Sequence, residues 1–298
     1  MKRILIVILS AASLFGCTNS QPNSDAYGNF EADKTLISAE VTGKIMQLNI
    51  EEGDLLIQGQ IVGQIDSLDL HLKKEQMNAQ ILSVKANFEQ INAQLEVQQQ
   101  QLENIEINKL RTENLKKEGA ATQKQLDDVQ GQYELAKKQI IAINSQRNAL
   151  NQQIKSLQEQ KKQIELNMQK CTLTNPVNGS VLNKYAMTGE MAMAGKALYA
   201  VADLSSLKLK AYISGQQLSE IKLGQQVKVL IDAPGGKMER LSGSIIWISE
   251  TAEFTPKTIQ TREDRVNLVY AFKVKVQNNG RLKIGMPGEV VFNSGEQN

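Results

Sequence analysis

The stretch that decides the fold is 70–170, whose apolar spacing is clearest in MNAQILSVKANFEQINAQLEVQQQQLENI (77–105) and LDDVQGQYELAKKQIIAINSQRNALNQQIKSLQEQKKQIELNM (126–168). Apolar residues recur there at alternating intervals of three and four, and Gln, Asn, Glu and Lys fill most other positions. This pattern is typical of a coiled coil, because each helix buries a narrow stripe against a partner of equal length. The predicted seam comprises Met77, Ile81, Val84, Phe88, Ile91, Leu95, Gln98, Leu102 and Ile105, then Leu126, Val129, Tyr133, Ala136, Ile140, Ile143, Arg147, Leu150, Ile154, Leu157, Lys161, Ile164 and Met168.

The pattern breaks at KKEGAAT (116–122). Gly119 can adopt the left-handed backbone that ends a helix, and Thr122 can cap the next one. Each arm is then about 48 residues, or roughly 72 Å at ~1.5 Å per residue. A single long helix is the alternative, but equal arms on either side of a Gly-containing break favour an antiparallel hairpin.

Composition limits the remaining chain to small modules. The protein has 298 residues, and a hairpin over 70–170 takes about a third of them, which leaves room for two small β modules rather than one enzyme-sized domain. Its 34 basic and 32 acidic residues are interspersed along the hairpin. No basic stripe suited to nucleic acid results, so the sequence argues against a nucleic-acid partner.

The N-terminus has the features of an export signal. Met1-Lys2-Arg3 precedes the apolar run Ile4–Leu9, and Leu14-Phe15-Gly16-Cys17 follows at the expected distance. The last four residues resemble a bacterial lipobox, in which the cysteine is acylated after cleavage, although Phe15 replaces the usual small residue. Lipid on Cys17 would hold the chain at a membrane surface. An ordinary signal peptide with an incidental cysteine is the alternative.

Two glycine-marked segments flank the hairpin. Gly43, Gly53 and Gly59 before it are matched by Gly179, Gly189 and Gly195 after it, at a constant offset of 136 residues. Each glycine is expected to mark a turn that few other residues tolerate. Because an antiparallel hairpin returns the chain to its starting point, the two segments are predicted to form one flattened β-sandwich.

From Leu204 onward the chain alternates between apolar and polar residues. Segments 207–213, 226–231, 244–249, 266–276 and 289–292 read as strands, and 216–222 as a helical connector. About six strands are expected, which suggests a small closed barrel without an exposed edge.

The paired half-motifs resemble the lipoyl or biotinyl-carrier fold. Their arrangement around a long hairpin is similar to the haemolysin-D-type membrane fusion proteins, also called periplasmic adaptor subunits. The segment from Glu253 to Tyr270 resembles adaptors that serve ATP-driven exporters, and LKIGMPG (282–288) resembles the family's last barrel turn. No modified-lysine turn occupies the junction between the halves, so no cofactor is expected.

The resemblance also implies a docking site at the hairpin tip. Arg111, Leu115 and Thr122 match the family's Arg-x3-Leu-x6-Ser signature for binding a TolC-like outer-membrane channel, with Thr in place of Ser. Leu would supply an apolar anchor, Arg a charged multi-donor group and Thr a small hydroxyl. A solvated Arg, a seam-edge Leu and a helix-capping Thr are the structural alternative.

No residues suggest catalysis. His71 is the sole histidine, and without clustered Cys or other His it cannot assemble a metal site or a catalytic relay. Cys171 is expected to be a small buried hydrophobe. No phosphate-binding glycine-rich loop is present, so any ATP hydrolysis belongs to a partner. We expect no enzyme, no metal and no cofactor.

The sequence therefore predicts an α+β chain: a coiled-coil hairpin inserted in a split lipoyl-like β-sandwich, followed by a small β-barrel. The predicted parts are 1–17 lipoprotein signal, 18–33 tether and first strand, 34–69 lipoyl-like half 1, 70–170 hairpin, 171–203 half 2, 204–293 barrel and 294–298 tail. The resemblance implies a periplasmic adaptor, lipid-anchored to the inner membrane and assembled as a hexamer, that links an inner-membrane transporter of ABC type to the outer channel. The alternatives are an adaptor of a proton-driven RND pump, an envelope-tethering lipoprotein and a carrier-domain enzyme subunit.

Overall fold

A computed structural model describes residues 24–235, 237–254 and 268–292. By its internal contacts the chain divides into two units, Met1–Thr35 with Asn178–Leu182 and Val201–Asn298, and Leu36–Val177 with Asn183–Ala200. Each unit is described by itself. Within the described ranges, no helix combines the length and apolar character needed to cross a membrane.

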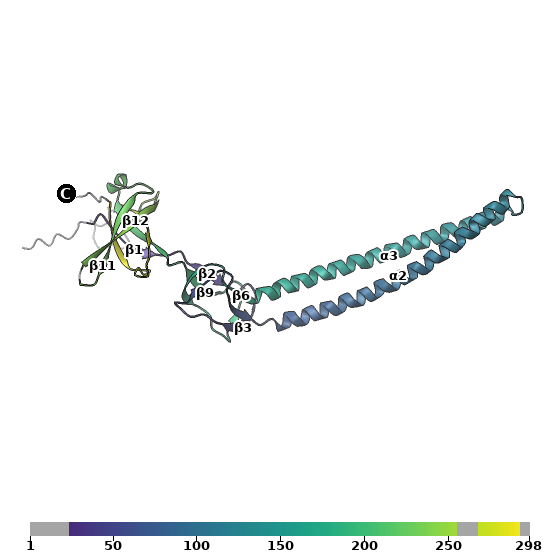
Figure 1. The fold of residues 1–298 in the computed structure, drawn as a ribbon, viewed down its shortest axis with the longest axis horizontal. Coiled ribbons are helices and arrows are strands. Elements are labelled where there is room, and N and C mark those ends of the chain that lie inside the picture. The colour runs from purple at the N-terminus through teal and green to yellow at the C-terminus, as the bar shows by residue number, and fades with distance from the viewer. Residues whose placement is uncertain (1–23, 236, 255–267, 293–298) are drawn as a thin grey trace, which may run out of the picture. The chain divides into compact units, whose positions relative to one another are not determined.

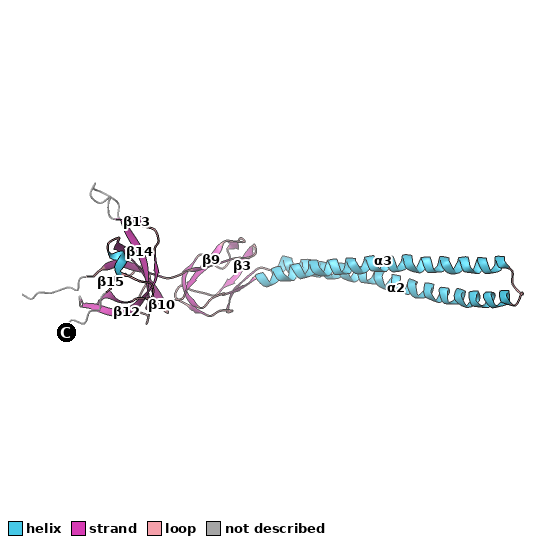
Figure 2. Ribbon diagram, turned by 90° about the horizontal axis from the view of Figure 1, so that it is seen from above, coloured by secondary structure: helices cyan, strands magenta, loops and turns pink. Residues whose placement is uncertain are grey.

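Two long helices form the predicted hairpin. Helix α2 runs from Leu68 to Lys117 and α3 from Gln123 to Lys170, so the arms have 50 and 48 residues. They lie side by side and antiparallel (Figures 1 and 2), and near one end Lys74 of α2 forms an ion pair with Glu165 of α3. The buried residues all belong to the predicted seam: Ile81, Val84, Leu95, Ala136, Ile143, Ile154 and Leu157. The hairpin is confirmed, and the single straight helix is excluded.

A polar position in the seam is satisfied across the hairpin. The Gln98 side-chain amide donates to Oε1 of Gln139 on the facing helix, at 2.8 Å. Near the base, Met77, Phe88 and Leu150 pack against the buried cluster of Ile81, Val84, Ile154 and Leu157. Apolar contact dominates the base of the rod, and farther along one glutamine pair lies among the buried apolar residues Leu95, Ala136 and Ile143.

The β-sandwich takes strands from both sides of the hairpin. One sheet has the order β2-β9-β7-β4 and the other β6-β5-β3-β8. Strand β3 pairs with β8, and β5 with β6, so segments separated by the whole hairpin are neighbours. The strands are β2 Thr35–Ser38, β3 Gly43–Leu48, β4 Leu55–Leu56, β5 Ile61–Ile65, β6 Thr172–Thr174, β7 Gly179–Lys184, β8 Met191–Ala192 and β9 Ala197–Ala202. The split sandwich is confirmed.

The two halves exchange equivalent hydrogen bonds. The amide of Gly59 donates to the carbonyl of Asn175 at 2.8 Å, and the amide of Gly195 donates to the carbonyl of Ala39 at 2.8 Å. Both donors and both acceptors are related by the 136-residue offset of the repeat. The sequence repeat is thus a structural two-fold relationship in which each half completes the other.

One polar pair is buried in the sandwich. Asn175 and Tyr199 are fully buried, and the Tyr199 hydroxyl donates to Oδ1 of Asn175 at 3.3 Å. The Asn175 amide in turn donates to the carbonyl of Ile57 at 3.0 Å. Burial raises the pKa of Tyr199 to about 12, because the core disfavours a phenolate.

The unit that includes Val201–Asn298 contains a closed barrel. Its strand order is β10-β1-β15-β11-β12-β14, and a β10–β14 pairing closes it, with β13 at the edge. The strands are β1 Ala26–Glu31, β10 Ser206–Ser214, β11 Gln226–Ala233, β12 Lys237–Ile248, β13 Glu253–Phe254, β14 Leu268–Gln277 and β15 Pro287–Val291; a 3₁₀ helix, η1 Gln217–Glu220, connects β10 to β11. Closure pairs the long strands on both sides and removes their edges.

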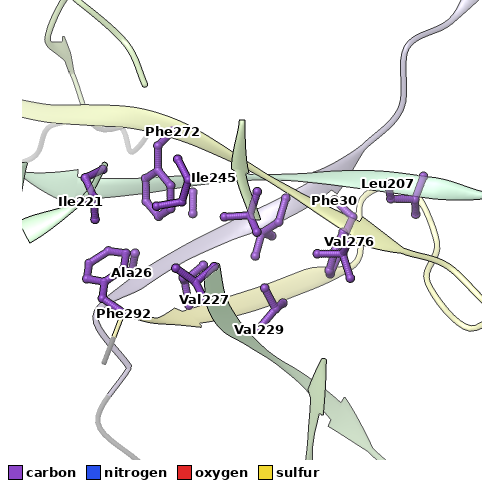
Figure 3. Packing of buried hydrophobic residues seen from close by; sticks show 14 of the residues in the cluster. Ala26, Phe30, Leu207, Ile221, Val227, Val229, Ile245, Phe272, Val276 and Phe292 are labelled. Atoms are coloured by element: carbon purple, nitrogen blue, oxygen red, sulfur yellow. The ribbon is translucent and has the colours of Figure 1, made fainter. Parts of the chain in front are cut away.

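Inward-facing residues from these strands form one core (Figure 3). Phe272 and Phe292 contact one another with ring centroids 5.7 Å apart, and Phe30 and Val276 lie further along the interior. The barrel expected after Leu204 is confirmed as an element of the fold. Strand β1, Ala26–Glu31, lies within the segment 18–33 for which a first strand is expected, and the structure places it in the barrel, where it pairs with β10 and β15.

Candidate functional site: the end of the helical hairpin

Helix α2 ends in a Schellman motif. The amide of Ala120 donates to the carbonyl of Leu115 at 2.8 Å, and that of Gly119 to Lys116 at 3.1 Å. Gly119 has φ of 77°, a left-handed conformation that glycine adopts without steric cost. These bonds satisfy carbonyls that the helix end leaves without partners, so the reversal is built into the local sequence.

Helix α3 starts with a capping box. Oγ1 of Thr122 accepts from the Gln125 amide at 3.2 Å, and Oε1 of Gln125 accepts from the Thr122 amide at 2.8 Å. The Thr122 hydroxyl also donates to Gln125 Oε1 at 3.0 Å. The hydroxyl is therefore engaged within the chain, as the structural alternative for Thr122 requires.

A cavity of about 310 Å³ opens where the two helices meet the loop. Leu115 forms part of its wall and is 40% exposed, so part of an apolar side chain is open to a partner at this end of the hairpin. The small side chains of Ala120 and Ala121 leave the space open. The lining residues are Thr112, Leu115, Ala120, Ala121, Gln125, Asp128 and Val129.

Arg111 lies one helical turn before Leu115 and is exposed. Within the described part of the chain, no hydrogen bond or ion pair engages its guanidinium group, whereas neighbouring Lys109 pairs with Glu113 at 3.6 Å. Of the three predicted docking residues, the structure places Leu115 in the cavity wall, Thr122 at the helix cap and Arg111 on the exposed surface of α2. Their docking role stays a prediction.

Sequence reasoning missed two polar residues of this site. Gln125 caps Thr122 and lines the cavity, and Asp128 adds a carboxylate to the same wall. The Thr-x-x-Gln spacing of 122–125 is a capping-box signal that could have identified Gln125. No sequence pattern marks Asp128, because its place in the wall depends on how α3 is rotated against α2.

The six repeat glycines have two structural roles. Gly53 and Gly189 have φ of 97° and 93°, and Gly59 and Gly195 have 82° and 86°, so these pairs adopt matching left-handed turns. Gly43 and Gly179 differ from expectation, because each begins a strand. A Cβ at Gly43 would lie 2.7 Å from Ile65 Cγ2, and one at Gly179 would lie 2.5 Å from the Ala202 carbonyl oxygen. Close approach excludes a side chain at both positions, and the φ of 157° at Gly179 also disfavours one.

The cysteines and the histidine offer no second site. Cys17, the predicted lipid attachment point, lies outside the described residues. Cys171 is buried, and burial together with the nearby Asp66 carboxylate raises the pKa of its thiol. His71 is exposed on α2. Across the described ranges, no cluster of His, Cys, Asp or Glu could hold a metal ion.

Two family models match adjacent parts of the chain. Residues 33–204 match the model described as RND MFP, barrel-sandwich hybrid domain, and residues 203–296 match the LcnD-like C-terminal domain. The first match covers the sandwich and the hairpin, which is more than half of the chain. The second covers most of the barrel.

Two relatives match this chain over nearly their whole length. The chain is 29% identical to a UPF0194 membrane protein of Enterobacter sp. (strain 638), over 98% of this chain and 97% of the relative. It is 27% identical to the UPF0194 membrane protein YbhG of Salmonella gallinarum, over 97% and 94% of the two chains.

Among solved structures, MacA from Actinobacillus actinomycetemcomitans aligns with a TM-score of 0.61 at 22% identity, over 89% of this chain and 76% of that one. The membrane fusion protein Spr0693 from Streptococcus pneumoniae aligns with a TM-score of 0.50 at 13% identity, over 90% and 97%. At these identities the structural likeness concerns the fold. The family match over 33–204, with which this likeness of fold agrees, shows that the chain belongs to the membrane fusion proteins.

Proposed function

We propose that this adaptor links an inner-membrane exporter to a TolC-like outer-membrane channel and that the hairpin end docks on the channel. The observation that carries the proposal is the partly exposed Leu115 in the wall of the terminal cavity, one turn from Arg111, whose guanidinium group has no hydrogen bond or ion pair among the described residues. Apolar anchors seated beside charged donors are typical of residues that dominate interface energies.

The length of the hairpin supports a bridging role. An arm of 50 residues spans about 75 Å at ~1.5 Å per residue, which a compact domain of the same mass could not reach. Most of each helix is exposed and polar, so the rod can stand in an aqueous compartment. A narrow apolar seam needs few apolar residues per helical turn. The other faces of each helix can therefore stay polar over the whole length of the rod.

We further propose an ABC-type exporter as the inner-membrane partner. The support is the resemblance of Glu253–Tyr270 to adaptors of ATP-driven exporters, although most of that segment lies outside the described residues. An RND pump is the second candidate, because the family model over 33–204 carries RND in its description. Copurification of the full chain with an ATPase and permease, rather than with a proton-driven pump, would decide between them.

Anchoring and assembly complete the proposal. Acyl chains on Cys17 would hold the chain at the inner membrane, since each buried methylene contributes about 0.8 kcal/mol. Six copies, as the family resemblance implies, would place six hairpin ends around one channel. Metabolic labelling with a palmitate analogue tests the anchor, and a Cys17→Ala chain should lose the label.

The docking role is tested in a strain that depends on this exporter for resistance. Leu115→Ser removes the apolar anchor and Arg111→Asp reverses the charge, so either change should abolish resistance at normal expression. Leu82→Ser and Lys85→Asp are matched controls, because both positions are exposed on the shaft of α2. The controls should retain resistance.

The outcomes separate docking from folding. Loss of resistance with normal abundance and helix content in both tip variants supports the docking role. Full resistance in both tip variants, or equal losses in the shaft controls, would contradict it.

A further inference from the structure

The outer face of the barrel carries an aligned row of side chains. Strand register places Tyr212 opposite Tyr27, Tyr27 opposite Glu289, and Glu289 opposite Leu230. The row therefore crosses β10, β1, β15 and β11 in sequence. Next to it, Asn29 pairs with Pro287, and Asp232 with Met238. Together these side chains line an open groove of about 410 Å³.

Two facing glycines form the floor between the rows. Gly28 pairs with Gly288, and both would point a side chain into the barrel rather than into the groove. A Cβ on Gly28 would lie 1.9 Å from the Lys210 carbonyl oxygen, and one on Gly288 would lie 3.0 Å from the Phe30 ring. Because neither position carries a side chain, the strands can pack closely here. The floor of the groove is therefore formed by backbone.

Leu230 gives the groove an apolar base. Its neighbours Val229 and Ile231 belong to the barrel core, whereas Leu230 points to the opposite face and is still only 1% exposed. Tyr27, which lies across Glu289 from Leu230 in the same row, is 58% exposed. A groove lined by a buried apolar side chain and an exposed aromatic ring can bind apolar groups.

The ionisable groups that line the groove with the tyrosines are both acidic, Asp232 and Glu289. The outer Tyr212 ring already has a cation over it, because Lys210 Nζ lies 5.3 Å from its centroid and is held by Glu253 at 3.3 Å. No cation lies over the Tyr27 ring among the residues that the structure describes. An aromatic face beside two carboxylates is suited to a positive charge.

We propose that this groove binds lipophilic organic cations. The aromatic or aliphatic groups of the ligand lie on Leu230, Met238 and Pro287, and its charge lies between the Tyr27 ring and the carboxylates of Asp232 and Glu289. The volume falls within the range of about 300–1,000 Å³ that is usual for small-molecule sites. The site is independent of the hairpin end, so it holds whether or not the channel-docking role does.

Two ions of the same shape and opposite charge test the proposal. Tetraphenylphosphonium and tetraphenylborate are titrated calorimetrically into the full chain in detergent, with matched detergent blanks. We expect saturable binding of the phosphonium at one site per chain and none of the borate. Tyr27→Ala and Asp232→Asn should each weaken phosphonium binding about five- to tenfold, which is the scale of one cation–π or charge contact.

Matched control variants distinguish a loss of binding in the groove from a general effect of removing a tyrosine or a carboxylate. Tyr185→Ala removes another exposed tyrosine and Asp69→Asn another exposed carboxylate, both in the other unit, and neither should change the affinity. Circular dichroism checks that each variant is folded. Equal binding of the two ions, absence of saturable phosphonium binding, or equal losses in groove and control variants would overturn the proposal.

Discussion

The hairpin and the barrel bury their apolar side chains in opposite ways. In the hairpin, Ile81, Val84 and Leu95 are the buried residues of a 50-residue helix, and Ile81 and Val84 belong to a small cluster with Ile154 and Leu157 of the facing helix. In the barrel, residues from six strands converge on one cluster, with Phe272 and Val229 fully buried. We therefore expect a substitution in the rod to lower stability only in the nearby helical turns. A substitution in the barrel core should lower the stability of the whole barrel, because all its strands contribute to that core.

The largest effect is expected from Phe272→Ala. The ring is fully buried against Phe292, so its loss removes transfer energy and leaves a cavity, lowering the free energy of unfolding of the barrel by about 3–5 kcal/mol. Chemical denaturation followed by Trp247 fluorescence measures this, since Trp247 lies on barrel strand β12. A decrease below about 1 kcal/mol would contradict a shared core.

A smaller and local effect is expected from Leu157→Ala. Leu157 is 6% exposed in the cluster at the hairpin base, and truncation should lower local stability by about 2–3 kcal/mol. Hydrogen exchange should accelerate in the adjacent turns of α2 and α3 and stay unchanged in β10–β15. Leu82→Ala, at an exposed position of α2, is the control; faster exchange in the barrel would break the comparison.

At the hairpin end, Thr122→Ala should lower helix stability by about 1 kcal/mol, because the cap that accepts from the Gln125 amide is lost. Thr122→Ser keeps the hydroxyl and should be close to neutral. Exchange of the first α3 amides gives the readout. If Ser and Ala variants behave alike, the capping box does not stabilise the reversal.

The smallest effect is expected at Cys171. Burial, and then the Asp66 carboxylate, raise the pKa of its thiol above the ordinary 9.0, so the folded chain keeps the neutral thiol. A raised thiol pKa favours the folded state below pH about 9 and loses that contribution as pH rises further, because only the unfolded chain ionises readily. Alkylation at Cys171, located by peptide mass, should stay slow at pH 8 and accelerate on denaturation. Rapid alkylation of the folded chain would contradict this assignment.

The hairpin could be read from the sequence because its determinants are local. The three-and-four spacing fixes which face is buried, and Gly119 and Thr122 fix where one helix ends and the next begins. The sandwich needed one long-range inference, namely that a hairpin returns the chain to its start. The repeat of the glycines at an offset of 136 residues supported this inference. In the structure, Gly59 and Gly195 make equivalent hydrogen bonds to the opposite half.

The features that the sequence did not predict depend on contacts between segments that are distant in sequence. A first strand is expected within 18–33, but nothing local indicates that Tyr27 pairs with Tyr212, so neither the place of β1 in the barrel nor the outer groove can be anticipated. Likewise, the resemblance to the family's docking signature indicates Leu115, but the cavity beside it depends on Ala120, Ala121 and Asp128. The turn assigned to Gly43 was replaced by a close contact with Ile65, which sequence spacing does not reveal.

Docking at the hairpin end is tested most directly by photocrosslinking in cells. A photoreactive residue is placed at Leu115 and, as the control, at Leu82 on the shaft of the same helix. Crosslinks to an outer-membrane channel from position 115 and none from position 82 are the predicted result. A chain that crosslinks to the channel from neither position, or equally from both, would contradict the role assigned to the hairpin end.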